Sequence, residues 1–181
     1  MAYHHGDLRR VLLDEAADVV AEHGPSALSL RDLARRAGVS HAAPAHHFGD
    51  KAGVLTALAA EGHRLLARAL EPAEQGLLDA GLAYVDFAVT HPGHFAVMFG
   101  RGLVHDVDAE LVAAQDRSGA ALRRAAPEPV VARAAWSVVH GFAALWLAGA
   151  ITGEDATTVA RPVLARALGG LDPGGPSPGH G

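Results

Sequence analysis

Cysteine is absent from this chain of 181 residues, which excludes disulfide bonds, thiol nucleophiles and zinc sites built on cysteine ligands. Aromatic residues amount to only 5% and charged residues to 19%, whereas hydrophobic residues make up 50%. Alanine is abundant and β-branched residues are few, so the composition favours helices over strands and excludes an intrinsically disordered chain. The length suits one domain, or a small domain joined to a medium one.

Lysine is nearly absent as well: Lys51 is the single lysine among fifteen basic residues, and the net charge is -5. A negative net charge argues against a protein that binds nucleic acid over its whole surface. The N-terminus has no basic start followed by an apolar run. The sequence therefore predicts no signal peptide and a cytoplasmic location.

A run without any charged residue lies between Arg133 and Glu154. A run of about 20 residues is long enough to cross a membrane. However, Ser137, His140 and Gly141 interrupt it, and no aromatic belt flanks it. We therefore expect a helix that is buried within a bundle or between subunits, and no membrane partner. A membrane-tethered helical protein is the alternative.

Motifs of catalysis and of metal or cofactor binding are absent from the sequence. It contains no G-x-S-x-G, no phosphate-binding loop and no glycine-rich dinucleotide fingerprint. Its twelve histidines include His91 and His94, three positions apart, but form no H-E-x-x-H or comparable cluster. The sequence predicts no enzyme, no cofactor and no metal site.

Apolar residues recur with helical periodicity along most of the chain and predict an all-α fold of about nine helices. The predicted helices span residues 8–23, 30–37, 41–47, 51–70, 73–90, 92–99, 107–125, 129–152 and 155–168. Ser29, Ser40 and Asp50 are the predicted N-caps around the second, third and fourth helices. Glycine, proline and serine dominate residues 169–181, which predicts a disordered tail.

Residues 29–47 have the layout of a helix-turn-helix, with Gly38-Val39-Ser40 as the turn. In such a motif the second helix enters the major groove of DNA. Residues 29–51 contain four basic side chains and two acidic ones, and His41, His46 and His47 add hydrogen-bond donors. A helical hairpin with glycine at its turn is often purely structural. The spacing alone therefore leaves both interpretations open.

Two stretches carry a resemblance. The run L-S-L-R-D-L-A-R-R-A-G-V-S over residues 28–40 is followed by H-F-G-D-K over residues 47–51. With these motifs, residues 7–66 resemble the N-terminal DNA-binding domain of the TetR family of bacterial transcriptional regulators. Further on, H-P-G-H-F over residues 91–95 and W-S-V-V-H-G over residues 136–141 resemble the WHG-type C-terminal ligand-binding domain of one subset of that family.

The resemblance implies which residues contact DNA. The candidates for phosphate contacts are Ser29, Arg31, Ser40, His47 and Lys51, and those for reading bases are His41, Ala42, Ala43 and His46. His47 can equally pack beside Phe48 as a structural hinge. Family members often have a phosphate-contacting tyrosine where this chain has Ala45. The substitution removes one backbone contact and leaves a largely apolar recognition surface, which can meet thymine methyl groups.

The resemblance also implies a small-molecule pocket and a dimer. Candidate ligand-binding residues are aromatic and apolar side chains with one histidine, namely Tyr84, Phe87, Phe95, Met98, Phe99, Trp136 and His140. Each could equally be ordinary core. The helices near 129–152 and 155–168 would pair with those of a second copy, because two reading heads recognise a pseudo-palindromic operator. The implied domains are residues 1–50 for DNA, 51–168 for ligand and dimer, and the tail.

The implied function is a ligand-responsive transcriptional regulator, in which an effector moves the helix over residues 51–70 and releases a repressor dimer from its operator. Two alternatives stay open on the sequence. Besides the membrane-tethered protein, a helical carrier of small molecules that no longer binds DNA would fit the negative net charge and Ala45. The expected partners are double-stranded DNA, an effector and a second copy of the chain.

Overall fold

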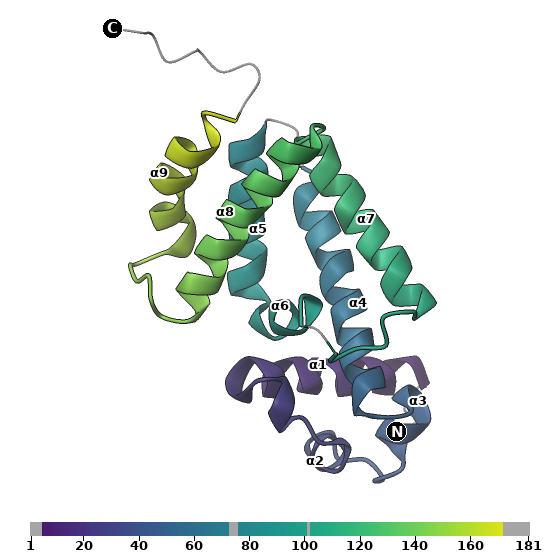
Figure 1. Cartoon of the computed structure of the whole chain (residues 1–181). Helices are drawn as coiled ribbons and strands as arrows, with labels where there is room; N and C mark the ends of the chain where they lie inside the picture. The colour runs from purple at the N-terminus through teal and green to yellow at the C-terminus, as the bar shows by residue number, and fades with distance from the viewer. Residues whose placement is uncertain (1–4, 73–75, 101, 172–181) are drawn as a thin grey trace, which may run out of the picture. The chain divides into compact units, whose positions relative to one another are not determined.

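A computed structural model describes residues 5–72, 76–100 and 102–171, and in these ranges all regular secondary structure is helical, with no strand (Figure 1). The all-α fold is thus confirmed. In chain order the elements are α1 (His5–His23), the 3-10 helix η1 (Pro25–Ala27), α2 (Leu30–Arg36), α3 (Ala43–Phe48), α4 (Lys51–Leu70), α5 (Leu77–Thr90), α6 (Pro92–Met98), α7 (Ala109–Ala125), α8 (Pro129–Leu147) and α9 (Ala156–Leu168).

Several helix ends follow from single residues. The carboxylate of Asp50 accepts a hydrogen bond from the Gly53 amide at 2.7 Å and caps α4, as predicted. Asp155 caps α9 by accepting from the Thr158 amide at 2.7 Å. Gly38 has φ 66°, a left-handed conformation that glycine adopts at little cost, and it turns the chain after α2.

Two predicted helix starts in the first part of the chain are wrong, and one correctly placed N-cap makes no side-chain bond. Residues 41 and 42 form a turn, and α3 begins at Ala43 with Ala42 as the N-cap in place of Ser40. Ser29 stands at the N-cap of α2, but its side chain makes no capping hydrogen bond. The first helix is predicted from residue 8, whereas α1 begins at His5. Short caps are hard to read from sequence because a backbone turn can replace the side-chain bond.

The predicted helix over 129–152 ends early, at Leu147. Gly149 adopts φ 71°, and the Ala150 amide then donates to the Leu145 carbonyl at 2.9 Å. This closure satisfies the last carbonyls of α8 without further helical turns. The predicted helix over 73–90 begins at Leu77, and residues 73–75 lie outside the described residues. The predicted tail lies outside them from residue 172 on.

The helices form two compact units, the first made of residues up to 64 together with residues 91–116. Its core joins α1, Leu28, α2 and the first part of α4 with α6 and the start of α7. Helix α6 approaches α1 so closely that a Cβ atom on Gly93 would overlap the backbone carbonyl of Ala17. The fully buried members of this core include Leu12, Val54, Leu58, Val97 and Leu111.

The second unit consists of residues 65–90 and everything from residue 117 on. Its core forms where α5 packs against α8 and α9, and Gly81 faces Val139, Leu164 and Leu168 there. Helix α4 is one continuous helix whose residues up to Arg64 belong to the first unit and the remainder to the second. The predicted division at residues 50 and 51 follows function, not contacts, and stays a prediction.

Candidate nucleic-acid interface and ligand cavity

The helix-turn-helix is built as its sequence pattern predicts. Leu33 and Ala34 anchor α2 in the core, and Val39 in the turn packs against the same core. Pro44 is buried in the first turn of α3, where no intrahelical bond is lost for lack of its N–H. The two helices therefore present their remaining faces to solvent at a fixed angle.

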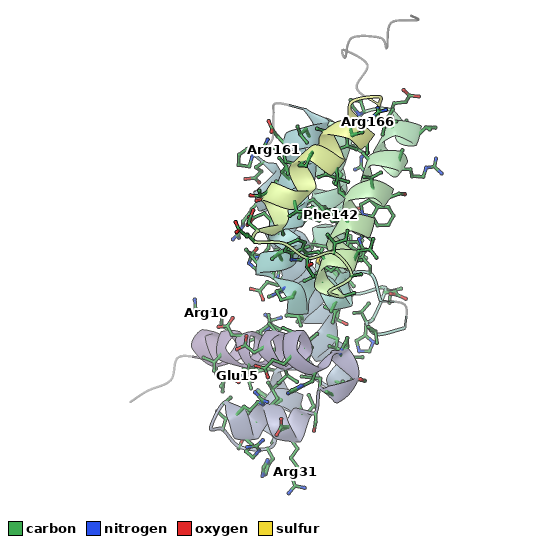
Figure 2. All side chains as sticks on the ribbon, turned by 90° about the vertical axis from the view of Figure 1, so that its left-hand side faces the viewer. Arg10, Glu15, Arg31, Phe142, Arg161 and Arg166 are labelled. Carbon is green, nitrogen blue, oxygen red and sulfur yellow. The ribbon has the colours of Figure 1, made fainter. Side chains whose placement is uncertain are left out.

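The predicted DNA-contact residues gather on this surface. Seven of them are exposed, namely Ser29, Arg31, Ser40, His41, Ala42, Ala45 and His46, and Ala43, His47 and Lys51 are half-buried. A surface hollow of about 420 Å³ is lined by Ser29, Arg31, Asp32, Arg35 and His41. Figure 2 shows the Arg31 side chain extending away from the ribbon at this surface. The exposed face of α3 contains no carboxylate.

Asp32 organises the charges of α2. Its carboxylate accepts hydrogen bonds from both the Nε and Nη2 atoms of Arg35, the former at 3.1 Å, and from the Nε atom of Arg36 at 3.2 Å. The bonds from Arg35 and Arg36 hold the pKa of Asp32 below its ordinary value. Asp32 thus partly neutralises two of the three arginines of α2, an arrangement that no pattern in the sequence predicts.

Lys51 has a structural partner in this structure. Its Nζ atom donates to the backbone carbonyl of Ser26 at 2.7 Å and ties the start of α4 to η1. The half-buried His47 is in edge contact with His46 at 5.6 Å between ring centroids, and in tilted contact with Phe48 at 6.2 Å. His47 thus packs beside Phe48, and both of its predicted roles, phosphate contact and hinge, stay predictions.

A second, polar cavity of about 220 Å³ lies in the same unit behind the end of α3. The guanidinium of Arg9 stacks over the Phe48 ring at 5.2 Å, and the His105 Nε2 atom lies 3.3 Å from the Asp50 carboxylate. The His105 amide also donates to Thr56 at 2.8 Å, which fixes the loop before α7 to α4. No local pattern in the sequence indicates these pairings, because they join residues far apart in the chain.

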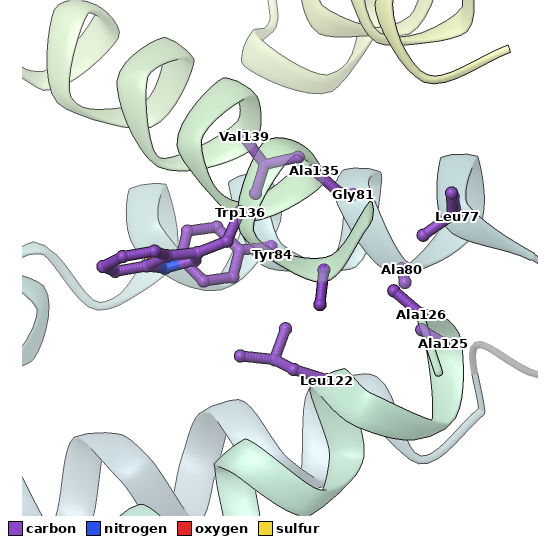
Figure 3. Close-up of a pocket in the computed structure, with 11 residues that line it drawn as sticks. Leu77, Ala80, Gly81, Tyr84, Leu122, Ala125, Ala126, Ala135, Trp136 and Val139 are labelled. Atoms are coloured by element: carbon purple, nitrogen blue, oxygen red, sulfur yellow. The ribbon is translucent and has the colours of Figure 1, made fainter. Parts of the chain in front are cut away.

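In the second unit a small cavity of about 30 Å³ opens among α5, α7 and α8 (Figure 3). Its walls are nearly all apolar, and its lining includes Leu77, Gly81, Leu122, Ala126, Ala135 and Val139 together with Tyr84 and Trp136. A space of this size can hold about one water molecule. None of its lining side chains is charged at neutral pH.

A chain of three polar side chains lies at this cavity. The indole Nε1 of Trp136 donates to the Tyr84 hydroxyl at 3.3 Å, and that hydroxyl lies 2.9 Å from the Nδ1 atom of His140. Burial lowers the pKa of His140 and raises that of Tyr84, so both are neutral at physiological pH. A neutral His140 can accept a hydrogen bond from the Tyr84 hydroxyl at its Nδ1 atom. The two hydrogen bonds then run in one direction, from Trp136 through Tyr84 to His140.

The structure divides the seven predicted ligand-binding residues between the two units. Tyr84 and Trp136 line the cavity, whereas His140 does not line it and is connected to it by the hydrogen bond with Tyr84. Phe87 is 2% exposed and is not among the lining residues. Phe95, Met98 and Phe99 belong to the other unit, where Phe95 and Phe99 contact each other. The position of Phe95, Met98 and Phe99 close to the H-P-G motif does not indicate that they belong to the first unit.

Helix α8 is the one described helix long and apolar enough to cross a membrane, which is weak support for a span because core helices of soluble proteins pass the same test. Only 22% of its most apolar window is buried. Within one chain α8 thus buries only the face that packs against α5 and α9, and burial of its other face between subunits stays a prediction. Its exposed face includes Trp136 at 38%, Leu145 at 49% and the open position Gly141. In the described part of the chain no three His, Asp or Glu residues gather as metal ligands would.

Comparison with known proteins agrees with this architecture. Residues 12–58 match the profile described as bacterial regulatory proteins of the tetR family. Residues 77–168, half of the chain, match the profile described as a tetracyclin repressor-like C-terminal domain. The chain is 42% identical over 45 residues to the HTH-type transcriptional repressor Rv3405c of Mycobacterium tuberculosis, a match that spans 24% of that relative's length.

Solved structures resemble most of the chain. A protein of unknown function from Rhodococcus sp. RHA1 is 35% identical, with a TM-score of 0.72, and the match covers 93% of this chain and 98% of that one. The TetR family transcriptional regulator PfmR of Thermus thermophilus is 26% identical, with a TM-score of 0.69 and coverage of 89% and 98%. With both profiles matched in order along one all-helical fold, the chain belongs to the TetR family of transcriptional regulators and is not an enzyme.

Proposed function

We propose that this regulator is a dimeric repressor that binds a pseudo-palindromic operator and leaves it when a small apolar effector binds. The observation that carries the DNA half of the proposal is the exposed surface of α2 and α3. There Arg31, His41 and His46 stand free of the core, and the exposed face of α3 has no carboxylate to repel phosphate. The repressor name of the mycobacterial relative supports the sign of regulation. A DNA target places the protein in the cytoplasm.

In this proposal the recognition helix reads bases through short side chains. Ala42, Ala43 and Ala45 offer apolar contacts of the kind that meet thymine methyl groups, whereas His41 and His46 supply donors. Arg31 and the exposed hydroxyl groups of Ser29 and Ser40 are assigned to phosphates, which fix the register on the duplex. Lys51 joins them only if its ammonium keeps a free proton beside the Ser26 bond, which its three donors allow.

The dimer is proposed to form through α8 and α9. A stripe of small residues, Ser137, Gly141, Ala144 and Ala148, runs along the outward face of α8 and lets a second helix approach closely. Leu145 on α8 and Val163 on α9 add exposed apolar side chains. A dimer would remove this surface from water, and it explains why an apolar helix of a regulator is so little buried in one copy.

The effector site is proposed at the cavity of Tyr84 and Trp136. Uncharged walls select an apolar molecule, and the polar chain that ends at His140 offers it one hydrogen-bonding anchor. Ligand pockets usually hold about 300–1,000 Å³, so this cavity must widen to admit an effector. Widening would displace α7 and α8 relative to α5. The effector would then bind the widened state more tightly than the closed state and shift the protein toward it.

The continuous helix α4 would carry that displacement. It has one end capped by Asp50 directly after α3 and the other end in the second unit. A shift of α4 changes the separation of the two recognition helices in the dimer and lowers operator affinity, with a coupling free energy of about 1–3 kcal/mol. In the same proposal residues 136–141 form the signature of the WHG subset.

Selection from random duplex DNA tests the DNA half. The wild-type chain should enrich an inverted repeat whose half-sites are separated by whole helical turns, as a two-fold symmetric dimer requires. Recovery of no enriched sequence by a folded dimer would contradict it and would favour the small-molecule carrier instead.

Intrinsic fluorescence tests the effector half. Trp136 and Trp146 are the two tryptophans of the chain, so the variant Trp146→Phe leaves Trp136 as the only reporter at the cavity. A library of apolar compounds should contain one that changes this emission and also releases the selected DNA. The matched variant Trp136→Phe should lose the signal. An effector that releases DNA without any change in Trp136 emission would place its site elsewhere.

A further inference from the structure

The surface of α2 and α3 that is proposed to face DNA contains a carboxylate, where only basic and neutral groups would be expected. Asp32 lies in the third position of α2 and lines the same hollow as Ser29, Arg31 and His41. Its side chain is 37% exposed, so solvent or a DNA phosphate can approach it. A negative charge at this position opposes the sequence-independent attraction between arginine side chains and phosphates.

The same carboxylate also restrains the two following arginines. Arg35 and Arg36 both bend back along α2 to reach Asp32, one turn before them. The Arg35 side chain is still 71% exposed, so it is held in place without being buried. Exposed ion pairs of this kind contribute little to the stability of a fold, so stability alone is a weak reason for the arrangement.

The geometry points to Asp32 as a specificity-determining residue that limits sequence-independent DNA binding by holding Arg35 and Arg36 along α2. This inference rests on the proposed binding of DNA through α2 and α3. On unrelated DNA, binding is almost wholly electrostatic, and free arginines can reach whichever phosphate is near. On the operator, base contacts fix the register, and the phosphates within reach of Arg35 and Arg36 are fixed with it. Release of the arginines therefore favours unrelated DNA more than the operator.

The test compares two duplexes by fluorescence anisotropy. One is the sequence that the wild-type chain enriches from random DNA, and the other is a shuffled sequence of the same composition. The variant Asp32→Asn keeps the shape of the side chain and removes its charge. If both arginines then reach phosphates, the log–log salt slope on the shuffled duplex should steepen by about 1.8. The ratio of the two affinities should fall on the order of 10-fold.

A charge-matched control separates this local effect from a change in net charge. Asp14 is an exposed carboxylate on α1, outside the hollow, and Asp14→Asn removes the same formal charge. It should leave the affinity ratio within about twofold of the wild type. In Asp32→Asn combined with Arg35→Gln and Arg36→Gln, the steeper slope should disappear. Thermal unfolding of each variant verifies that α2 remains folded.

Three results would overturn the inference. An equal gain on both duplexes would make Asp32 a general repulsive charge without a role in specificity. A loss of operator affinity would make it a residue that positions the arginines for productive contacts. Unchanged affinities on both duplexes would leave it without either role. Failure of the wild-type chain to prefer any sequence is a different result, because it removes the proposed function itself before Asp32 is considered.

Discussion

The ammonium group of Lys51 donates a hydrogen bond to the backbone carbonyl of Ser26 across 2.7 Å and so joins the start of α4 to η1. Lys51 is the single lysine of the chain, whereas the other basic residues are arginines. A compact ammonium group fits one carbonyl better than the planar fork of a guanidinium does. The bond therefore holds η1, the segment that leads into α2, against the start of α4.

Replacement of Lys51 by glutamine should accordingly have two effects. Loss of an exposed, charge-assisted bond should lower the free energy of unfolding by about 1 kcal/mol. Loss of the charge should weaken operator binding, and Lys51→Arg should restore affinity but only part of the stability. Urea denaturation and anisotropy on the same preparations measure both quantities. Equal stability of all three proteins would show that the bond to Ser26 does not hold η1.

The contact between α6 and α1 sets a second prediction. Gly93→Ala would place a methyl group against the Ala17 carbonyl, and because both partners are backbone, the two helices must separate. We expect a loss of about 1–3 kcal/mol in the free energy of unfolding. Gly119→Ala is the matched control, since its nearest neighbour is the flexible tip of Arg123 at 3.2 Å. That change should be stabilising by about 0.4–1 kcal/mol. Similar effects of both changes would contradict the close packing of α6.

Buried histidines set the pH dependence of stability. His63 is 6% exposed, and burial lowers its pKa below the ordinary 6.5, as burial also does for His140. Below about pH 6.5 the unfolded chain thus binds more protons than the folded chain, and the free energy of unfolding falls as the pH falls. Each group contributes at most about 1.4 kcal/mol per pH unit.

Urea denaturation at pH 7.5 and pH 5.5 measures this loss. His63→Gln should make the difference between the two pH values smaller, whereas His23→Gln should not, because the His23 side chain is 57% exposed. The carboxyl groups whose pKa values are lowered, such as Asp50 and Asp155, titrate below this window and do not interfere. A profile that His63→Gln leaves unchanged would show that His63 does not titrate differently in the two states.

The exposed face of α8 predicts the oligomeric state. Leu145→Asp should convert the protein from twice the chain mass of 18.6 kDa to that mass in sedimentation, because a buried charge opposes the helix pairing. Val112→Asp on α7 is the control, since Val112 is also an exposed apolar residue, at 40%, but lies outside α8 and α9. A wild-type monomer, or dissociation by both variants, would contradict the proposed interface.

Local signals made most of the fold predictable. Helical periodicity located every α-helix, and Gly38 and Asp50 placed the turn after α2 and the start of α4 because each acts on its own neighbours in the chain. The end of α8 was missed although Gly149 marks it. Alanine and leucine before it and isoleucine after it have no strong preference against a longer helix, and only the backbone closure decides.

The candidate sites were less predictable because they depend on long-range packing. Residues 29–51 were sufficient to predict a candidate DNA-facing surface, yet no local pattern predicted that Asp32 would hold two arginines along α2. The aromatic residues near His91 were predicted to line one pocket together with Tyr84. However, α6 packs against α1, so Phe95 and Met98 belong to the first unit and Tyr84 to the second. No sequence period distinguishes a core aromatic residue from a ligand-binding one.

Salt dependence of binding to operator DNA tests the central claim most directly. Anisotropy with DNA from upstream of the protein's own gene, between about 50 and 200 mM salt, should give a steep negative log–log slope, because each phosphate neutralised contributes about -0.9. The double variant Arg31→Ala and Lys51→Ala should flatten that slope while the protein stays folded and dimeric. Specific binding whose salt slope flattens in the double variant would support the proposed contacts of α2 and the start of α4 with DNA. A slope that the double variant leaves unaltered would contradict the assignment of α2 and the start of α4 to the DNA backbone.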